Sequence, residues 1–499
     1  MSAGCCTRSD AVHTDVVVVG NGPSAISLSF FLSGNRPYYN GHPHSHDYIV
    51  NKLQNAKGQS LVDQDLMFLS EGLEGRSPNP VALLFDALCH PDADQGGDSP
   101  SLLTWKKEPH HHIPHVVLGK TRPGGSWQKM DGTMQTISQN TWMELPTVPF
   151  REWLNKKQRS AGLSLTRATV ADVKDYYSEF VKEKGLSENF RDFHTVTSIR
   201  KVFQVKNHAD SESGEIEPCC VNFKQKHGFL WEVRGYSINT TNNNIIIDDV
   251  ENPSETGQPH REDFCYISTN VVLATGTYDI PNKLSIPGET LPCVVHSYAD
   301  YERMVQRGDF SSACDPVVVI GAGLSAADAV LMSVAAEIPV LHVIRRNATD
   351  PNLIYNKLPR SVYPEYHHIL SLIKGEAECE FYRPCPRQQV VEIKEDGKVL
   401  MRAVDGDIIT TIDTSLVVVL IGSRSDLSFL PNDGRNLGIV PKYPIDSTHN
   451  PIDVDPLSYQ SVHEPNLFAV GPLVADNFVR FGIGGALGVT SYLHKRKST

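Results

Sequence analysis

The segment DVVVVGNGPSAISLSFFLSG, from Asp15 to Gly34, decides the fold of the amino-terminal part of the chain. Its four consecutive valines, Val16–Val19, predict a strand that is buried on both faces. Small and apolar residues follow the glycine turn and predict a helix from about Ser24 to Leu32, which ends at the helix-stopping Gly34. A strand, a tight glycine turn and a helix in this order form the first half of a β-α-β unit.

The turn Gly20-Asn21-Gly22-Pro23-Ser24-Ala25 fits the pattern G-x-G-x-x-A. The first glycine permits the tight turn, the second lets a pyrophosphate approach the backbone, and the small third residue lets helix and strand pack closely. The free N–H groups at the helix start would then bind the anion. This pattern predicts a dinucleotide site at Gly20, Gly22, Pro23, Ser24 and Ala25. An ordinary tight turn is the alternative interpretation.

A second segment, DPVVVIGAGLSAADAVLMSVAAEIPVLHVIRR, runs from Asp315 to Arg346 and repeats this logic. It predicts a strand over 317–320, a helix over 324–336 and a second strand over 340–344, which together make a complete β-α-β unit. The second turn contributes four candidate cofactor-binding residues, Gly321, Gly323, Ser325 and Ala326. Two such turns, each between a strand and a helix, favour nucleotide binding over an ordinary turn.

The last strand of this second unit runs directly into Arg345-Arg346. An acidic residue at this place would bind a ribose 2′-hydroxyl, whereas arginine suits a 2′-phosphate because its guanidinium forms bidentate bonds with phosphate oxygens. The pair therefore favours NADPH over NADH. A solvated basic pair at the end of a strand is the alternative.

The first unit has no second strand close behind its helix. Residues 35–114 are rich in His, Pro, Gly and Asp, and we interpret them as an insertion with helices near 61–69 and 81–88. The run HVVL at 115–118 is the candidate second strand. It ends in Gly119-Lys120, without the acid expected to hold a ribose.

Three further glycine signals follow a fixed order along the chain: RPGGSW at 122–127, VVLATG at 271–276 and NLFAVG at 466–471. Each alone could be a loop, but together with the two turns their order is specific. They add seven candidate cofactor-binding residues: Gly124, Gly125, Trp127, Ala274, Thr275, Gly276 and Gly471.

Composition narrows the class of protein. The 499 residues are 40% hydrophobic, which suits two to four folded domains, and the net charge of −12 argues against nucleic acid as a partner. Apolar runs are far shorter than the roughly 20 residues that cross a bilayer. None of the ten cysteines forms a C-x-x-C pair, which favours a reducing compartment and argues against a disulfide reductase. We expect a cytoplasmic location.

The order of motifs resembles that of flavoproteins with two dinucleotide-binding domains, in particular the flavin-dependent monooxygenases and N-hydroxylases. The resemblance implies an α/β fold with two Rossmann-like domains. An FAD domain would comprise residues 12–304, with the insertion at 35–114, and a return segment at 430–495. An NADPH domain at 305–429 would be inserted into it.

Longer strings carry a closer resemblance, among them IPHVVLGKTRPGGSW, NTWMELP, LPRSVYPEYH and NLFAVGPLVADNFVRFGIGGALGVT. They are similar to the oxidative stress-induced growth inhibitor family, from about residue 12 to 495. The resemblance implies an NADPH-dependent monooxygenase linked to growth control, cell death and cytokinesis, with the midbody as an added location. Its partners would be NADPH, molecular oxygen and an oxygenation substrate, for which a protein side chain, a small amine and a lipid-derived ketone stay open.

Three positions depart from the wider monooxygenase pattern. Before His296-Ser297, Thr290 and Pro292 stand where phenylalanine and glycine are usual. A proline follows Gly471 where an aspartate is usual, with Asp476 as a candidate substitute. The third departure is the missing acid near Lys120.

Flavin monooxygenation through a C4a-hydroperoxide requires orientation and a dry cavity from the protein, because the cofactor carries the difficult step. Asn140 is the candidate for hydrogen bonding near the flavin, with a turn asparagine as the alternative. His296 is the second catalytic candidate, with a structural histidine as the alternative.

Two other functions stay open: an NADPH oxidase-like flavoprotein that produces peroxide, and a non-catalytic regulatory protein with structural FAD. We predict no metal site. His110-His111-His112 and the nearby His115 are interpreted as an exposed loop, since adjacent histidines rarely converge on one ion.

Overall fold

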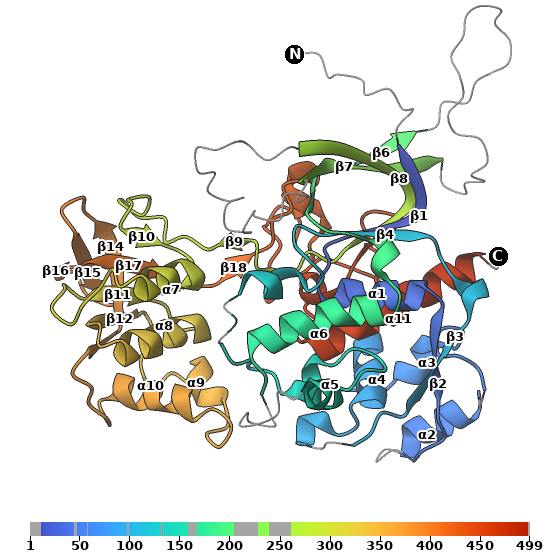
Figure 1. Cartoon of the computed structure of the whole chain (residues 1–499), viewed down its shortest axis with the longest axis horizontal. Helices are drawn as coiled ribbons and strands as arrows, with labels where there is room; N and C mark the ends of the chain where they lie inside the picture. The colour runs from blue at the N-terminus through green and yellow to red at the C-terminus, as the bar shows by residue number, and fades with distance from the viewer. Residues whose placement is uncertain are drawn as a thin grey trace, which may run out of the picture. The chain divides into compact units, whose positions relative to one another are not determined.

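The computed structural model describes residues 11–43, 47–56, 58–96, 99–130, 132, 134–157, 167–203, 228–238 and 261–497. The chain divides into two compact units, each drawn in Figure 1. Unit 1 comprises Met1–Thr277 and Ser425–Thr499, and unit 2 comprises Tyr278–Arg424. Residues 280–306 supply strands and a helix that pack within unit 2.

A mixed seven-stranded sheet forms the centre of unit 1. Its strands are β1 (Val12–Val19), β4 (His115–Leu118), β5 (Phe190–Arg191), β6 (His194–Phe203), β7 (Phe229–Ile238), β8 (Arg261–Leu273) and β19 (Leu467–Ala469). β4 and β8 flank β1 in parallel, with Val17 opposite Val116 and Val271. The expected strand at 115–118 is therefore confirmed. The carboxyl ends of these parallel strands meet at one edge of the sheet, where ligands bind in such folds.

β8 joins the parallel and antiparallel parts of this sheet. Its first half pairs antiparallel with β7, and its last three residues pair in parallel with β19. β6 also pairs antiparallel with β7, and the residues between these strands and between β7 and β8, 204–227 and 239–260, lie outside the described residues.

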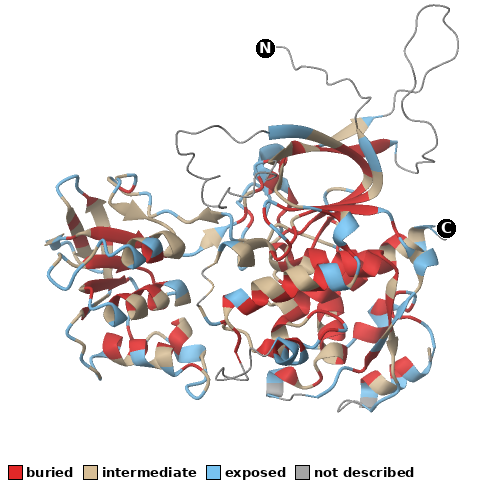
Figure 2. Cartoon of the chain, viewed as in Figure 1, coloured by how far each residue is buried: buried red, intermediate tan, exposed pale blue. Residues whose placement is uncertain are grey.

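Two long helices pack together beneath the sheet (Figure 1). α1 (Pro23–Leu32) is buried throughout from Ala25 to Leu32, as Figure 2 shows by its red ribbon. α11 (Val479–Lys497) packs against α1 and against α4 (Pro80–Cys89). Glycines make the close packing of α11 possible, because a Cβ at Gly484 would overlap the backbone of Ala82 in α4.

The expected insertion contains helices and one pair of strands. The helices are α2 (Asp47–Gln54), α3 (Leu66–Ser70) and α4, and β2 (Asn35–Tyr39) pairs antiparallel with β3 (Leu103–Lys107). After β4, the chain forms α5 (Phe150–Lys156) and the amphipathic α6 (Val170–Glu183), whose Tyr176 and Tyr177 are fully buried. These elements enlarge the core of unit 1.

Unit 2 has a parallel five-stranded sheet in the order β10-β17-β11-β12-β13. The strands are β10 (Val294–Val295), β11 (Val317–Ile320), β12 (Val340–Ile344), β13 (Tyr382–Pro386) and β17 (Leu416–Val419). Its helices are α7 (Tyr298–Gln306), α8 (Leu324–Ala335), α9 (Ile354–Lys357) and α10 (Pro364–Lys374). The β-α-β unit predicted over 317–344 is confirmed within one residue.

Two smaller sheets complete unit 2. β14 (Gln388–Ile393), β15 (Lys398–Ala403) and β16 (Ile409–Asp413) form an antiparallel sheet, and β9 (Ile280–Pro281) pairs with β18 (Ser423–Arg424). The fold is therefore α/β with mixed sheets. None of the helices in the described part of the chain has the length and apolarity that crossing a membrane requires.

Candidate functional site

Gly20 lies where the carboxyl ends of three parallel strands meet. Its N–H donates a hydrogen bond to the carbonyl of Leu118 (2.8 Å), at the end of β4. Its φ of +106° favours glycine, and a Cβ there would overlap the carbonyl of Ala274, directly after β8. The structure therefore brings the first glycine of the turn and the Ala274-Thr275-Gly276 segment together.

Gly22 lies at the N-cap of α1, beside the segment that contains Gly124 and Gly125. The N–H of Gly124 donates to the carbonyl of Asn21 (2.9 Å), and a Cβ at Gly125 would lie 2.9 Å from Cα of Gly22. A Cβ at Gly22 itself would meet nothing within 4 Å. This helix terminus thus has free space in front of its unpaired N–H groups, which is what a pyrophosphate requires. Trp127, in the short 3-10 helix that follows, is half-buried against the core.

Two glycines from the carboxyl-terminal part of the chain lie at the first turn of α1. A Cβ at Gly471 would lie 2.6 Å from Oγ of Ser24, and one at Gly482 would overlap the same hydroxyl. Gly471 has a φ of +70°. Close approach at Ser24 therefore requires glycine at both positions, so the return segment helps to shape this site.

The Ala274-Thr275-Gly276 segment offers polar groups at the same edge of the sheet. The Oγ1 of Thr275 is shielded from solvent and has no hydrogen-bond partner among the described residues. Gly276 has a φ of +68° with free space at its Cβ position, and its carbonyl accepts from Oγ of Ser425 (2.5 Å).

Asn140 is buried at the start of a 3-10 helix, Asn140–Met143. That helix packs against the beginning of α11: the ring of Trp142 lies 6.1 Å from that of Phe478 and 4.4 Å from the guanidinium of Arg480. Asn140 thus belongs to a segment fixed against α11, whose Gly482 contacts the first turn of α1.

Arg480 holds the insertion against α11, although it is fully buried. Its guanidinium forms ion pairs with Asp86 (2.7 Å) in α4 and with Asp94. Two carboxylates and the ring of Trp142 compensate the buried charge. These partners lie almost 400 positions away, so no local sequence pattern indicates them.

Asp476, the candidate substitute for the missing aspartate, is also buried. Its carboxyl accepts hydrogen bonds from Oγ of Ser77 (2.5 Å), Nδ2 of Asn79 (3.0 Å) and the Tyr459 hydroxyl (3.2 Å). Burial raises its pKa to about 7, although these three donors act in the opposite direction. The carboxyl therefore connects the insertion to the return segment.

Asp476→Asn is expected to change how stability depends on pH. An unfolded aspartate ionises near pH ~3.9, whereas the folded Asp476 retains its proton up to about pH 7. The unfolded state therefore binds fewer protons between these values, and the wild-type protein loses stability as pH rises through this window, by at most roughly 4 kcal/mol. Asparagine does not titrate, so the melting temperature of the variant should rise relative to wild type between about pH 5 and pH 8. A constant difference across this range, measured by circular dichroism, would mean that the carboxyl is ionised throughout.

Asp192 is a candidate that sequence reasoning missed. β5 pairs in parallel with β4, so Asp192 follows β5 at the edge where Gly119 and Lys120 follow β4. The N–H of Gly119 donates to the carbonyl of Arg191 (3.1 Å), which fixes this neighbourhood. Oδ1 of Asp192 is shielded from solvent without a hydrogen-bond partner among the described residues. Burial raises the pKa of Asp192 to about 6, against the charges of Arg122 and Lys182.

Lys120 occupies the position where an acid was expected. Its Nζ lies 3.5 Å from the carboxylate of Asp426. Burial opposes ionisation of Asp426, but hydrogen bonds from Ser428 and the charge of Lys120 outweigh it and lower its pKa. Lys120 thus pairs with Asp426 and supports the loop that contains it.

The second glycine turn, in unit 2, repeats the features of the first. Gly321 has a φ of +145°, and a Cβ there would overlap the carbonyl of Leu420 and lie 3.3 Å from Cβ of Ala326. Gly323 is the N-cap of α8, and a Cβ there would meet nothing within 4 Å. Ser325 is exposed in the first turn of this helix. The start of α8 therefore also combines free N–H groups with free space.

Two buried side chains fix the carbonyls of this second turn, and the sequence did not indicate either. His342 in β12 donates from Nε2 to the carbonyl of Gly321 (2.8 Å) and accepts at Nδ1 from the Tyr382 hydroxyl (3.1 Å). Burial lowers the pKa of His342 to about 4, so the ring is neutral. The hydroxyl of Tyr355 donates to the carbonyl of Gly323 (3.0 Å).

The two arginines that follow β12 differ in their contacts. Both side chains are exposed, but Nη1 of Arg346 lies 3.4 Å from the carboxylate of Asp350. No ion pair of Arg345 is found among the described residues. Arg345 is therefore the better placed of the two for a phosphate.

His296, the second catalytic candidate, lies in unit 2 directly after β10. Its Nε2 lies 3.0 Å from Oε1 of the buried Glu289. Burial opposes ionisation of Glu289, but hydrogen bonds from His296 and from the N–H groups of Leu284 and Ser285 lower its pKa. The pair stabilises the turn over 284–289 and orients the imidazole.

Comparison with known proteins shows which proteins share this fold. A family model described as pyridine nucleotide-disulphide oxidoreductase matches residues 242–451. Among solved structures, bacillithiol disulfide reductase from Staphylococcus aureus aligns over 97% of this chain and 99% of its own with a TM-score of 0.56 at 14% identity. Ornithine hydroxylase from Pseudomonas aeruginosa aligns over 97% of this chain and 100% of its own with a TM-score of 0.53 at 12% identity. The fold is thus that of the pyridine-nucleotide flavoprotein oxidoreductases.

Two human proteins are much closer in sequence. Oxidative stress-induced growth inhibitor 2 is 43% identical over 98% of this chain and 94% of its own length. Oxidative stress-induced growth inhibitor 1 is 44% identical over 97% of this chain and 95% of its own length. The chain belongs to the oxidative stress-induced growth inhibitor family.

Proposed function

We propose that this protein is an FAD- and NADPH-dependent monooxygenase that acts in the control of cell growth, death or cytokinesis. The observation that carries the proposal is the free space at Gly22, enclosed by Gly125 and by the carboxyl ends of β1, β4 and β8. Unit 1 would bind FAD and unit 2 NADPH, which moves the proposed domain boundaries from 304 and 430 to 277 and 425. The location would be cytoplasmic, with the midbody added during division.

The FAD pyrophosphate would bind the N–H groups at the start of α1, where the helix dipole favours an anion. The proposed FAD-binding residues are Gly20, Gly22, Pro23, Ser24, Ala25, Gly124, Gly125, Trp127, Ala274, Thr275, Gly276 and Gly471. Among them, Thr275 has a shielded hydroxyl that lacks a partner within the described chain, and a polar atom of FAD would satisfy it. The residues present therefore fit a dinucleotide.

The NADPH pyrophosphate would bind in the same way at the start of α8. The proposed residues are Gly321, Gly323, Ser325, Ala326, Arg345 and Arg346. Arg345 would bind the 2′-phosphate, because Arg346 already has Asp350 as a partner.

When bound, FAD would accept hydride from NADPH and activate molecular oxygen at its C4a position. The chain would supply orientation and exclusion of water. Asn140, held against α11, is proposed to orient the flavin ring by a hydrogen bond. His296 is proposed as the second catalytic residue, with Glu289 fixing its ring.

Asp192 is proposed to bind the FAD ribose in place of the acid that is missing after β4. Asp192→Asn removes a charged acceptor, so FAD affinity should fall by about 1.5–3 kcal/mol, or roughly 10- to 150-fold. The fold should persist, because the carboxylate is partly desolvated and its pKa is raised. Fluorescence titration of apoprotein with FAD measures the effect. Asp263→Asn, an exposed change on β8 of the same sheet, is the matched control. Equal affinity in the two variants would exclude Asp192 from the ribose site.

Anaerobic mixing with NADPH, followed by oxygen, tests the proposed function. We expect NADPH to bleach the flavin, and oxygen to restore it through a transient absorbance that differs from both oxidised and reduced flavin. Rapid reoxidation with one peroxide released per NADPH, and no transient, would instead identify an oxidase. Bound FAD that NADPH never bleaches would indicate a non-catalytic regulatory protein. If the transient absorbance is seen, candidate substrates are protein side chains, small amines and ketones. The true substrate should lower the amount of peroxide released per NADPH.

A further inference from the structure

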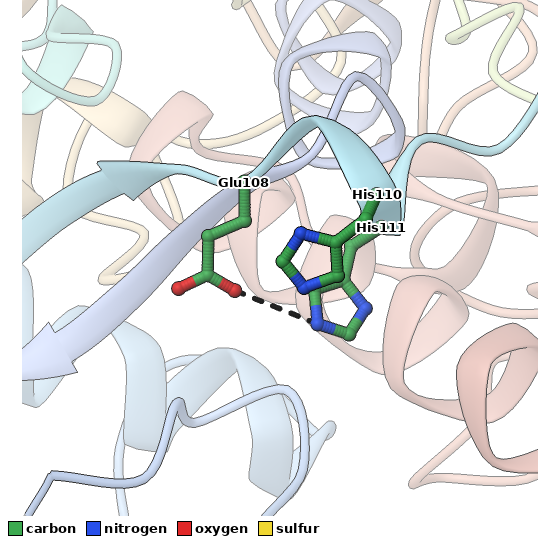
Figure 3. A group of neighbouring side chains, drawn as sticks. All are labelled: Glu108, His110 and His111. Carbon is green, nitrogen blue, oxygen red and sulfur yellow. Dashed lines mark ion pairs between the residues drawn. The ribbon is translucent and has the colours of Figure 1, made fainter.

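A group of metal-binding side chains lies in unit 1, on the segment that leads from β3 to β4. Glu108 is the N-cap of a 3-10 helix, Pro109–His111, which contains His110 and His111. The backbone here is fixed from both sides: the N–H of Glu108 donates to the carbonyl of Gly34 (2.7 Å), and the N–H of His111 donates to the carbonyl of Glu108 (3.0 Å). The tight turn places the three side chains on the same side, as Figure 3 shows.

The ligand atoms of these side chains converge. Each residue offers one atom, and the three atoms lie within 4.8 Å of one another. Oε2 of Glu108 is 3.5 Å from Nε2 of His111, and the centroids of the two imidazole rings are 4.2 Å apart. Ligands of a tetrahedral zinc ion lie roughly 3.4 Å apart, so small side-chain rotations would bring the set to binding distance.

We propose that Glu108, His110 and His111 bind a divalent transition-metal ion, with Zn²⁺ as the ion that this set of ligands suits best. Two imidazoles and one carboxylate are typical ligands of zinc and leave a further coordination position open. The sequence alone suggested an exposed loop, because adjacent histidines rarely converge. In the structure, the 3-10 conformation brings the two imidazoles together, and Glu108 adds a carboxylate as a third ligand.

Surrounding groups orient the carboxylate. The hydroxyl of Tyr38 donates to Oε1 of Glu108 (2.5 Å), and Nε of Arg36 lies 3.4 Å from Oε2. Hydrogen-bonded outer partners of this kind fix the ligands of metal sites. Arg36 also carries a positive charge that repels a cation, although Asp63 pairs with it. The affinity should therefore be moderate rather than that of a structural zinc finger.

A cavity of about 540 Å³ adjoins the site. Its lining includes His110, His111, His112, Asp63 and His494, and the ring centroid of His494 lies 5.1 Å from that of His111. The cavity leaves room for water or another small ligand at the open coordination position. Lys495 and Lys497 also line it and give such a ligand a cationic surrounding.

Zinc titration of the full-length, untagged protein tests the proposal. The protein is stripped with a chelator, kept reduced so that its cysteines stay thiols, and titrated with Zn²⁺ against a chromophoric competitor. The double variant His110→Ala/His111→Ala should bind one equivalent less than wild type. Tyr38→Phe removes only the hydrogen bond to Glu108 and should lower the affinity for this zinc ion roughly tenfold. The bound Co²⁺ spectrum should lack the charge-transfer band that thiolate ligands give.

His368→Ala is the control, because His368 is exposed on α10 in unit 2 and does not line this cavity. It should bind zinc like wild type. Flavin content and melting temperature of the metal-free proteins establish that each variant is folded. The proposal is overturned if wild type and the double variant bind the same number of equivalents, or if His368→Ala loses as much zinc as the double variant does.

Discussion

Gly22→Asp is expected to give a folded protein that no longer retains FAD. The backbone at Gly22 has a φ of −72°, which any residue adopts, and an added Cβ meets nothing within 4 Å. Aspartate is also a favourable N-cap, so α1 should gain stability. The new carboxylate would lie in front of the helix terminus, where the pyrophosphate is proposed to bind, and would repel and displace it. The ratio of flavin to protein absorbance after gel filtration should fall to background.

Gly185→Asp is the matched control for this variant. It introduces the same charge into unit 1 at an exposed glycine whose Cβ position is also free. Gly185 has a φ of +65°, so this control also includes a backbone strain that Gly22→Asp lacks and is a stringent test of folding. Gly20→Ala, unlike Gly22→Asp, should disturb the fold itself, because its Cβ would overlap the carbonyl of Ala274. A Gly22→Asp protein that is as yellow as the Gly185→Asp protein would contradict the assignment of FAD to unit 1.

Gly323→Asp is expected to impair the binding of NADPH while leaving FAD bound. Gly323 is the exposed N-cap of α8, with a φ of −91° and free space at its Cβ position. The variant should keep its FAD, because the change lies in unit 2. Reduction of that FAD by NADPH should slow about 100-fold or more, as expected when charge-assisted bonds worth roughly 3 kcal/mol are lost. Stopped-flow measurement of flavin bleaching under anaerobic conditions records this rate.

Dithionite should still reduce the flavin of Gly323→Asp, which shows that the flavin itself is intact. Gly375→Asp places the same charge at the exposed carboxyl-terminal end of α10. The φ of +72° at Gly375 makes this substitution cost some stability, but the rate of reduction should stay unchanged. If Gly323→Asp is reduced by NADPH at the wild-type rate, unit 2 does not bind NADPH through this turn.

The sequence predicted those elements whose signals are local. Four consecutive apolar residues in Val317–Ile320 and a glycine turn suffice to place β11 and α8, because a strand buried on both faces needs an unbroken apolar run. The strand at 115–118 was found despite 80 intervening residues, because the run HVVL carries the same signal. The first glycine of each turn, Gly20 or Gly321, has a positive φ that favours glycine, so the residue type itself indicates the turn.

What the sequence missed depends on contacts between distant residues. Helix α11 begins at Val479 although its first turns are rich in glycine, since packing against Ala82 and Ser24 stabilises a segment that helix propensity disfavours. Asp192 was missed because β5 has only two residues and carries no strand signal. Only the pairing of β5 with β4 positions Asp192 at the edge of the sheet. The ion pairs of Arg480 join residues 86, 94 and 480, and no pattern at a single locus encodes them.

The return of the chain to unit 1 has a consequence for biosynthesis. β19 completes the central sheet, and Gly471 and Gly482 pack closely against Ser24 in the first turn of α1. On the ribosome, a nascent chain that has grown to residue 424 holds all of unit 2 but lacks this final segment. Unit 2 can fold during elongation, whereas flavin incorporation must wait until the last stretch emerges from the exit tunnel. If FAD binds in unit 1 as proposed, newly made polypeptide passes through a stage without flavin.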